Sequence, residues 1–69
     1  MQLTIDYEQE EDGRWIAEVL ELPGVLVYGS SEEEAIAHAR ALALRVLAER
    51  IEQGEETSPS MNISFAVAA

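Results

Sequence analysis

The positions of apolar residues along the chain predict strands near both ends and a long helix between them. From Leu3 to Glu8 and from Arg14 to Leu20, apolar and polar residues alternate, which is the period of a half-buried strand. Asp12-Gly13, between the two stretches, suits a hairpin turn that needs positive φ. Leu22-Pro23-Gly24 then breaks the pattern, and Val25 to Tyr28 are predicted to form a short third strand.

A helix is predicted to begin after Ser31. Ser31 and Glu34 have the spacing of a capping box, and the two glutamates between them place negative charge at the positive end of the helix dipole. The helix should run to about Gln53, with Gly54 following in left-handed conformation. Residues 55–60 are then predicted to be a polar linker.

Renewed alternation from Met61 to Ala68 predicts a fourth strand, so the element order is strand, strand, strand, helix, strand. Three antiparallel strands followed by a right-handed crossover give a four-stranded sheet of order 3-2-1-4. The fold class is therefore α+β, a two-layer sandwich with one helix on one face of the sheet. We find no internal repeat, and residues 1–69 are expected to form a single domain.

The predicted helix has more apolar surface than one sheet contact requires. One stripe, wide enough to cover a sheet, contains Ala35, Ile36, Ala39, Leu42, Ala43, Val46 and Leu47. A second stripe contains Ala37, Ala41, Leu44, Ala48 and Ile51, and Ile16 and Leu20 lie among charged residues on the solvent side of the second strand. Chains this short commonly need a staple, so we interpret these seven residues as candidates for the interface of a homo-oligomer, a dimer or a dimer of dimers.

Composition narrows the classes of partner and site. Fourteen acidic residues, four arginines and no lysine give a formal charge of −10, which argues against binding nucleic acid or anionic lipid through a basic patch. The same charge favours encounter with a basic partner, although solubility alone also explains it. No cysteine is present, and we expect no metal or other cofactor. The N-terminus lacks a signal-peptide pattern, and no apolar run reaches the roughly 18 residues of a membrane span, so a cytoplasmic protein is expected.

Residues that could support catalysis lack the further side chains that a catalytic site needs. Asp6 lies on the first strand, where a two-metal ribonuclease site could begin, but the fourth strand offers only Asn62 and Ser64. His38 falls on the polar strip of the helix, and the nearby serines are explained by capping. Tyr7 and Trp15 alternate with polar residues and suit a core better than a base-stacking platform. We expect a protein that is not an enzyme.

The segment from Asp12 to Ala35 contains, in order, an Asp-Gly turn, a strand, a Pro-Gly turn, a short strand and the capped start of a helix. In order and spacing it resembles the HicB-like antitoxins, proteins of bacteria and archaea that neutralise small RNA-cutting toxins. The resemblance extends well from Leu3 to about Glu52 and loosely over the last strand, and its matching positions are Gly13, Trp15, Ala17, Glu18, Leu22-Pro23-Gly24, Gly29, Ser31 and Glu33-Glu34-Ala35. It implies a partial ribonuclease H-like fold, in agreement with the order 3-2-1-4.

Two departures from the family pattern are Leu20, where many members have proline, and Ser30-Ser31, where Asp-Thr is frequent. Serine caps a helix about as well as threonine, so neither change conflicts with the fold. Many members also carry a C-terminal domain that binds the operon promoter. The 69 residues leave no room for one, so we expect a short, stand-alone member that does not bind nucleic acid directly.

The resemblance implies stoichiometric binding to a small basic ribonuclease of the HicA type. Acidic residues of the first hairpin are our candidates for attraction to that toxin: Glu8, Glu10, Glu11 and Asp12. A second hypothesis is a stand-alone oligomeric binding module of the same fold with no toxin partner. A neighbouring reading frame that encodes a small basic protein would favour the first hypothesis.

Overall fold

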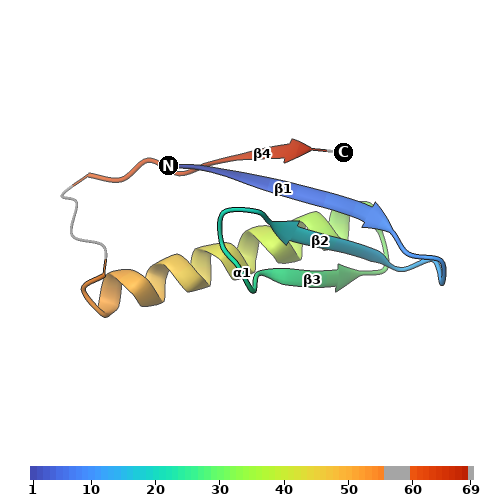
Figure 1. Cartoon of the computed structure of the whole chain (residues 1–69), viewed down its shortest axis with the longest axis horizontal. Helices are drawn as coiled ribbons and strands as arrows, with labels where there is room; N and C mark the ends of the chain where they lie inside the picture. Colours follow the sequence, from blue (N-terminus) through green and yellow to red (C-terminus); the bar gives the residue numbers. More distant parts are fainter. Residues whose placement is uncertain (56–59, 69) are drawn as a thin grey trace.

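A computed structural model, which describes residues 1–55 and 60–68, contains one sheet and one helix. The elements are β1 (Gln2–Gln9), β2 (Trp15–Val19), β3 (Leu26–Gly29), α1 (Glu32–Glu52) and β4 (Ser64–Ala68). Strand order is β3-β2-β1-β4, with β4 parallel to β1 and the other pairs antiparallel. The helix packs against β1, β2 and β3 on one face of the sheet (Figure 1). The predicted α+β architecture and strand order are therefore confirmed.

The third and fourth strands begin later than predicted. The third strand begins at Leu26, because the N–H of Val25 still donates to the carbonyl of Leu22 in the preceding turn. The fourth begins at Ser64, well after Met61. Ser64 is the register partner of Gln2, the first residue of β1, so β1 has no strand residue left with which an earlier part of β4 could pair. The predicted linker is described only at residues 55 and 60, since 56–59 lie outside the described residues.

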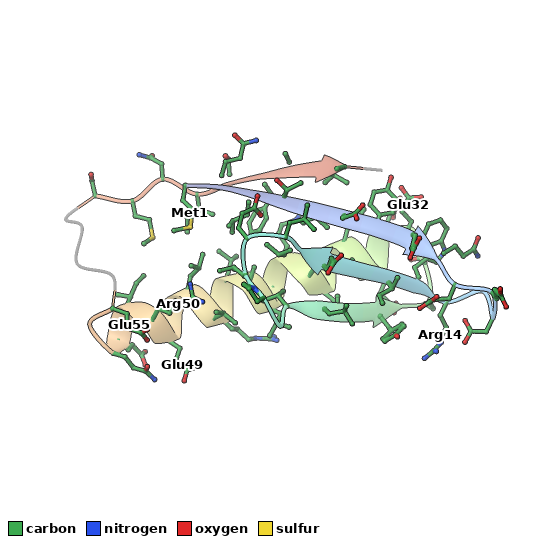
Figure 2. The ribbon with its side chains drawn as sticks, in the orientation of Figure 1. Met1, Arg14, Glu32, Glu49, Arg50 and Glu55 are labelled. Carbon is green, nitrogen blue, oxygen red and sulfur yellow. The ribbon has the colours of Figure 1, made fainter. Side chains whose placement is uncertain are left out.

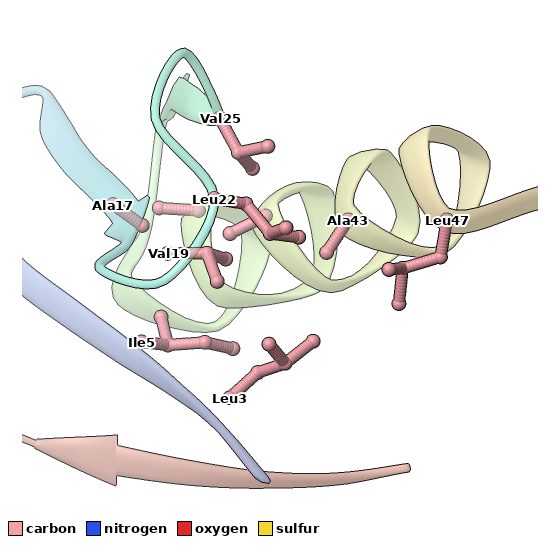
Figure 3. Close-up of a cluster of buried hydrophobic side chains, with 10 residues drawn as sticks. Leu3, Ile5, Ala17, Val19, Leu22, Val25, Ala43 and Leu47 are labelled. Atoms are coloured by element: carbon pink, nitrogen blue, oxygen red, sulfur yellow. The ribbon is translucent and has the colours of Figure 1, made fainter. Parts of the chain in front are cut away.

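The core lies between the sheet and α1 and is built from small side chains. Figure 3 shows the ten buried residues, of which four are alanines: Leu3, Ile5, Ala17, Val19, Leu22, Val25, Ala35, Ala39, Ala43 and Leu47. Alanines allow the helix to approach the sheet closely, but each buries little apolar area. Tyr7 and Trp15 pack against this core, with ring centroids 6.1 Å apart, in keeping with the prediction that they are core residues.

Both ends of α1 are capped by specific hydrogen bonds. The hydroxyl of Ser31 accepts a bond from the N–H of Glu34, as predicted. The Glu34 carboxylate, however, accepts from the N–H and hydroxyl of Ser30, one residue earlier than in a standard capping box. At the other end Gly54 has the expected positive φ, +77°, and N–H groups of residues 54 and 55 bond back to the carbonyls of residues 51 and 50 in a Schellman motif.

The molecule is elongated, about 43 × 19 × 16 Å, because the C-terminal part of α1 continues past the end of the sheet (Figure 1). Large apolar side chains are exposed in several places. Leu20, Leu26 and Tyr28 lie on the sheet face away from α1. Met1 precedes β1, Val67 lies on β4, and Leu44 and Ile51 lie on α1. In the described part of the chain, no helix is long and apolar enough to cross a membrane.

Candidate partner-binding face

The sheet face opposite α1 combines carboxylates with apolar side chains. Alternation along the strands places on this face the residues that point away from the core, and we call seven of them the outer patch: Asp6, Glu8, Ile16, Glu18, Leu20, Leu26 and Tyr28. The three acids are exposed, whereas Ile16 is half-buried between its neighbours. The patch is therefore an apolar surface on β2 and β3 beside an acidic surface on β1 and β2.

The strand register sets two of these carboxylates opposite one another. Asp6 of β1 pairs with Glu18 of β2, and Glu8 pairs with Ile16. Like charges directly opposite in an antiparallel pair destabilise a sheet, whereas opposite charges there stabilise it. Stability of the free protein therefore gives no reason for this pair, and a cationic group from another molecule would relieve the repulsion.

A hollow of about 240 Å³ opens between these side chains. It is lined by Asp6, Tyr7, Glu8, Ile16, Glu18 and Leu26. The volume is below the roughly 300–1,000 Å³ of sites for drug-sized ligands. Its size and its mixed walls suit one long cationic side chain, whose methylene groups would contact Ile16 and Leu26 while its charged end meets the acids.

Arg14 lies at the hairpin end of the outer patch and is already engaged. Its Nε is 2.8 Å from Oδ2 of Asp12, and its guanidinium carbon is 4.5 Å from the ring centroid of Tyr28. The same arginine lowers the pKa of Asp12, chiefly because its backbone N–H donates to the Asp12 carboxylate. Arg14 therefore holds Tyr28 and Asp12 in place at this corner of the patch.

The four acids predicted to face a toxin fall into two groups. Glu10, Glu11 and Asp12 gather around Arg14 at the tip of the hairpin, beside a shallow hollow. Glu8 lies apart from them, on the outer patch with Asp6 and Glu18. Because Asp12 is paired with Arg14, it contributes less to an outward negative field than the two glutamates beside it.

Asp6, Glu18, Leu26 and Tyr28 were not among the predicted site residues. The signal for them was present in the alternation of β1 and β2, which puts Asp6 and Glu18 on the same face as Ile16. Recognising the site also required the register, because only the pairing of Asp6 with Glu18 brings the two carboxylates together.

The seven predicted oligomer-interface residues do not form one surface. Ile16 and Leu20 belong to the outer patch, as their position among charges suggested. Ala37, Leu44, Ala48 and Ile51 are exposed on α1. Ala41 is half-buried and lies on the opposite flank of the helix, where it lines a hollow with Val27 of β3.

The residues considered for catalysis take part in local structure. Nδ1 of His38 is 3.2 Å from the carbonyl oxygen of Tyr28, and Ser30 and Ser31 are engaged in the helix cap. Asp6 pairs with Ala68 of β4, while Ser64 lies beside Gln2 at the other end of that strand. Across residues 1–55 and 60–68, no group of three or more His, Cys, Asp or Glu side chains could hold a metal ion.

Searches of protein-family models, curated proteins and solved structures gave no significant match to this chain. A functional assignment therefore depends on the geometry and charge of the outer patch and on the resemblance of the Asp12 to Ala35 segment.

Proposed function

We propose that this protein is an antitoxin that neutralises a small RNA-cleaving toxin of the HicA type by stoichiometric binding. The observation that carries the proposal is the outer patch, where Asp6 and Glu18 face each other beside exposed apolar residues. A ribonuclease has a basic surface because it must bind phosphates, and that surface is complementary to this patch.

The chemistry of the patch supports binding rather than turnover. Carboxylates attract and orient a basic partner at long range, while apolar side chains supply the contact area that slows dissociation of the complex. Glu10 and Glu11 at the hairpin tip lie on the rim of this surface and would act mainly on the rate of encounter. No cofactor is needed for such a role, and a cytoplasmic location accords with a partner that cleaves RNA.

Binding kinetics with a candidate HicA-type toxin, a small basic protein encoded in a neighbouring reading frame, test the proposal. The double variant Asp6→Asn/Glu18→Gln keeps side-chain size while removing two charges from the centre of the patch. We expect about tenfold or greater loss of affinity, with both slower association and faster dissociation. Glu10→Gln/Glu11→Gln should slow association, most clearly at low salt, and leave dissociation nearly unchanged.

Glu52→Gln/Glu55→Gln is the matched control, because it also removes two negative charges but does so at the far end of α1. Glu55 is labelled in Figure 2. The dissociation rate of the control should match that of the unsubstituted protein. Equal weakening by the control and the patch variant would show that net charge, not the outer patch, governs binding. Failure to bind any small basic protein from the native neighbourhood would instead favour the stand-alone binding module.

A further inference from the structure

A second apolar surface surrounds β4, on the opposite side of the sheet from the outer patch. Phe65 and Val67 lie on the helix-facing side of β4, in register with the buried Leu3 and Ile5 of β1, and Val67 is 49% exposed. Met1, which precedes β1, is exposed as well. We call this surface the edge patch, and define it by Met1, Leu44, Ile51, Phe65 and Val67. It is uncovered because β4 is the outermost strand, whereas α1 packs across β1, β2 and β3.

Leu44 and Ile51 lie on the flank of α1 that faces β4. The hollow beside β3 is lined by His38, Leu42 and Arg45, which fixes the β3 flank of the helix. At about 100° per residue, Leu44 and Ile51 fall on the opposite flank, next to the buried Leu47. The exposed apolar residues of the helix therefore border the same side of the molecule as the exposed face of β4.

The backbone of β4 also has free hydrogen-bonding groups. Ser64 donates its N–H to the carbonyl of Met1, the residue before β1. Because successive residues of a strand direct these groups to opposite sides, the N–H and C=O of Phe65 and Val67 point to the outer edge. Natural edge strands are usually protected by charges, proline or bulges. Residues 60–68 contain no charged residue and no proline.

The distribution of charge indicates which molecule can pair with β4. The chain carries −10 overall, so two copies repel unless they meet where acidic residues are absent. The stretch 60–68 is neutral, whereas the outer patch carries three carboxylates. A basic partner is attracted to the outer patch, and a second copy of this chain can approach most closely at β4.

We propose that two copies pair through β4, antiparallel and about a twofold axis at Ala66, to form one continuous eight-stranded sheet. This register places Phe65 opposite Val67 of the partner twice, with their outward N–H and C=O groups bonded. An aromatic side chain opposite a β-branched one is a favourable cross-strand pair. In this symmetric arrangement one contact pairs the exposed β4 edges of both copies. Both helices then lie on the same face of the combined sheet.

Pairing through β4 would compensate for the small core of a single copy. Leu3 and Ile5 are the largest fully buried side chains, and four of the ten core residues are alanines. A chain of this length buries only about 60% of the surface that its unfolded form exposes, a smaller fraction than a larger domain buries. Burial of Phe65 and Val67 across the twofold axis would add apolar contact that the single copy does not have.

Sedimentation at micromolar concentrations tests the proposal with two matched variants. Val67 and Leu26 are 49% and 47% exposed, and both lie on edge strands. The unsubstituted protein and Leu26→Glu should sediment as dimers, while Val67→Glu should raise the dimer dissociation constant by at least about tenfold. A monomeric unsubstituted protein, or a fully dimeric Val67→Glu, would overturn the proposal. Dissociation by Leu26→Glu with no effect of Val67→Glu would place the interface on the outer patch.

Cysteine cross-linking covers the case in which Val67→Glu fails to fold. The chain has no cysteine, so an introduced one is the only thiol. Ala66→Cys should form a disulfide between copies under mild oxidation, because residues opposite each other at such a position have Cα atoms about 4.5 Å apart, within disulfide range. Leu26→Cys should remain unlinked. Equal linking of both variants, or none of Ala66→Cys, would contradict pairing through β4.

Discussion

At Gly29 the end of β3 approaches the start of α1 closely. A Cβ atom at this position would lie 2.5 Å from the backbone nitrogen of Ala35 and 2.9 Å from its Cα. Both neighbours are backbone atoms at the capped start of α1, so they can move only if the junction between β3 and α1 shifts. The absence of a side chain at Gly29 therefore allows the short connection from β3 into the helix.

We predict that Gly29→Ala lowers the free energy of unfolding by about 1–3 kcal/mol, the usual cost of overpacking a close contact. Urea unfolding followed by circular dichroism measures it. Ser30→Ala, at the next residue, is a useful control, because it removes a hydroxyl bonded to Glu34 without adding volume. It should lower the free energy of unfolding by less than Gly29→Ala does. A Gly29→Ala protein as stable as the unsubstituted one would mean that the junction opens without strain.

Glu21 holds the end of β1 beside β2 through its carboxylate. Its two oxygens accept bonds from the N–H of Thr4 at 2.6 Å and from the Thr4 hydroxyl at 2.7 Å. The bond from the Thr4 backbone is the main reason that the pKa of Glu21 is lowered from its ordinary 4.5. Glu34, bonded by Ser30, has a lowered pKa for the same kind of reason.

A lowered folded-state pKa means that Glu21 stabilises the fold above the unfolded-state pKa, and that this contribution is lost as pH falls through the folded-state pKa. We predict that the stability difference between the unsubstituted protein and Glu21→Gln is constant from pH 7 to about 4.5, the ordinary pKa, and shrinks below it. Comparing two denaturation series across pH removes the effect of net charge, which both proteins share apart from one group. A difference that grows on acidification would contradict this assignment.

At the scale of the elements, the alternation of β1 and β2 and the capping residues of α1 allowed strand order and helix limits to be predicted. The strand ends were less predictable, because β3 and β4 begin where hydrogen-bond partners become available and not where apolar residues begin. The candidate partner-binding face was predicted only in part. Glu8 could be chosen from the acidic hairpin, but Asp6 and Glu18 became a pair only through the register of β1 on β2.

That pair gives a prediction in which stability and function change in opposite directions. Glu18→Lys converts repulsion across the strands into attraction, so the thermal midpoint of the free protein should rise by a few degrees. The same change should weaken binding to a basic toxin. Scanning calorimetry and a binding assay on one sample measure both effects. A lowered midpoint would show that the sheet tolerates these two carboxylates without cost.

At the scale of the whole molecule, the distribution of charge argues against direct binding to DNA. Arg40, Arg45 and Arg50 lie on α1 in different directions, and Arg14 is paired with Asp12. Since affinity for a duplex depends on neutralising several phosphates, we predict no complex with a promoter fragment at about 0.15 M salt, where the Debye length is about 8 Å. Submicromolar binding in a gel shift would refute this.

In the two proposals, the exposed apolar surfaces have separate roles. The outer patch combines apolar side chains with carboxylates that suit a basic partner, and the edge patch includes part of a neutral strand that suits a second copy. Because they lie on opposite sides of the sheet, a dimer formed through β4 leaves both outer patches accessible. Such a dimer would bind two toxin molecules independently.

Titration of RNA cleavage tests the antitoxin assignment most directly. Increasing amounts of this protein are added to a fixed amount of a candidate HicA-type toxin from a neighbouring reading frame, and the remaining cleavage of a model RNA is measured. We predict a linear loss of activity that ends when one chain has been added per toxin, and a shallow, incomplete loss with Asp6→Asn/Glu18→Gln. Undiminished cleavage in the presence of excess protein would contradict the proposed function.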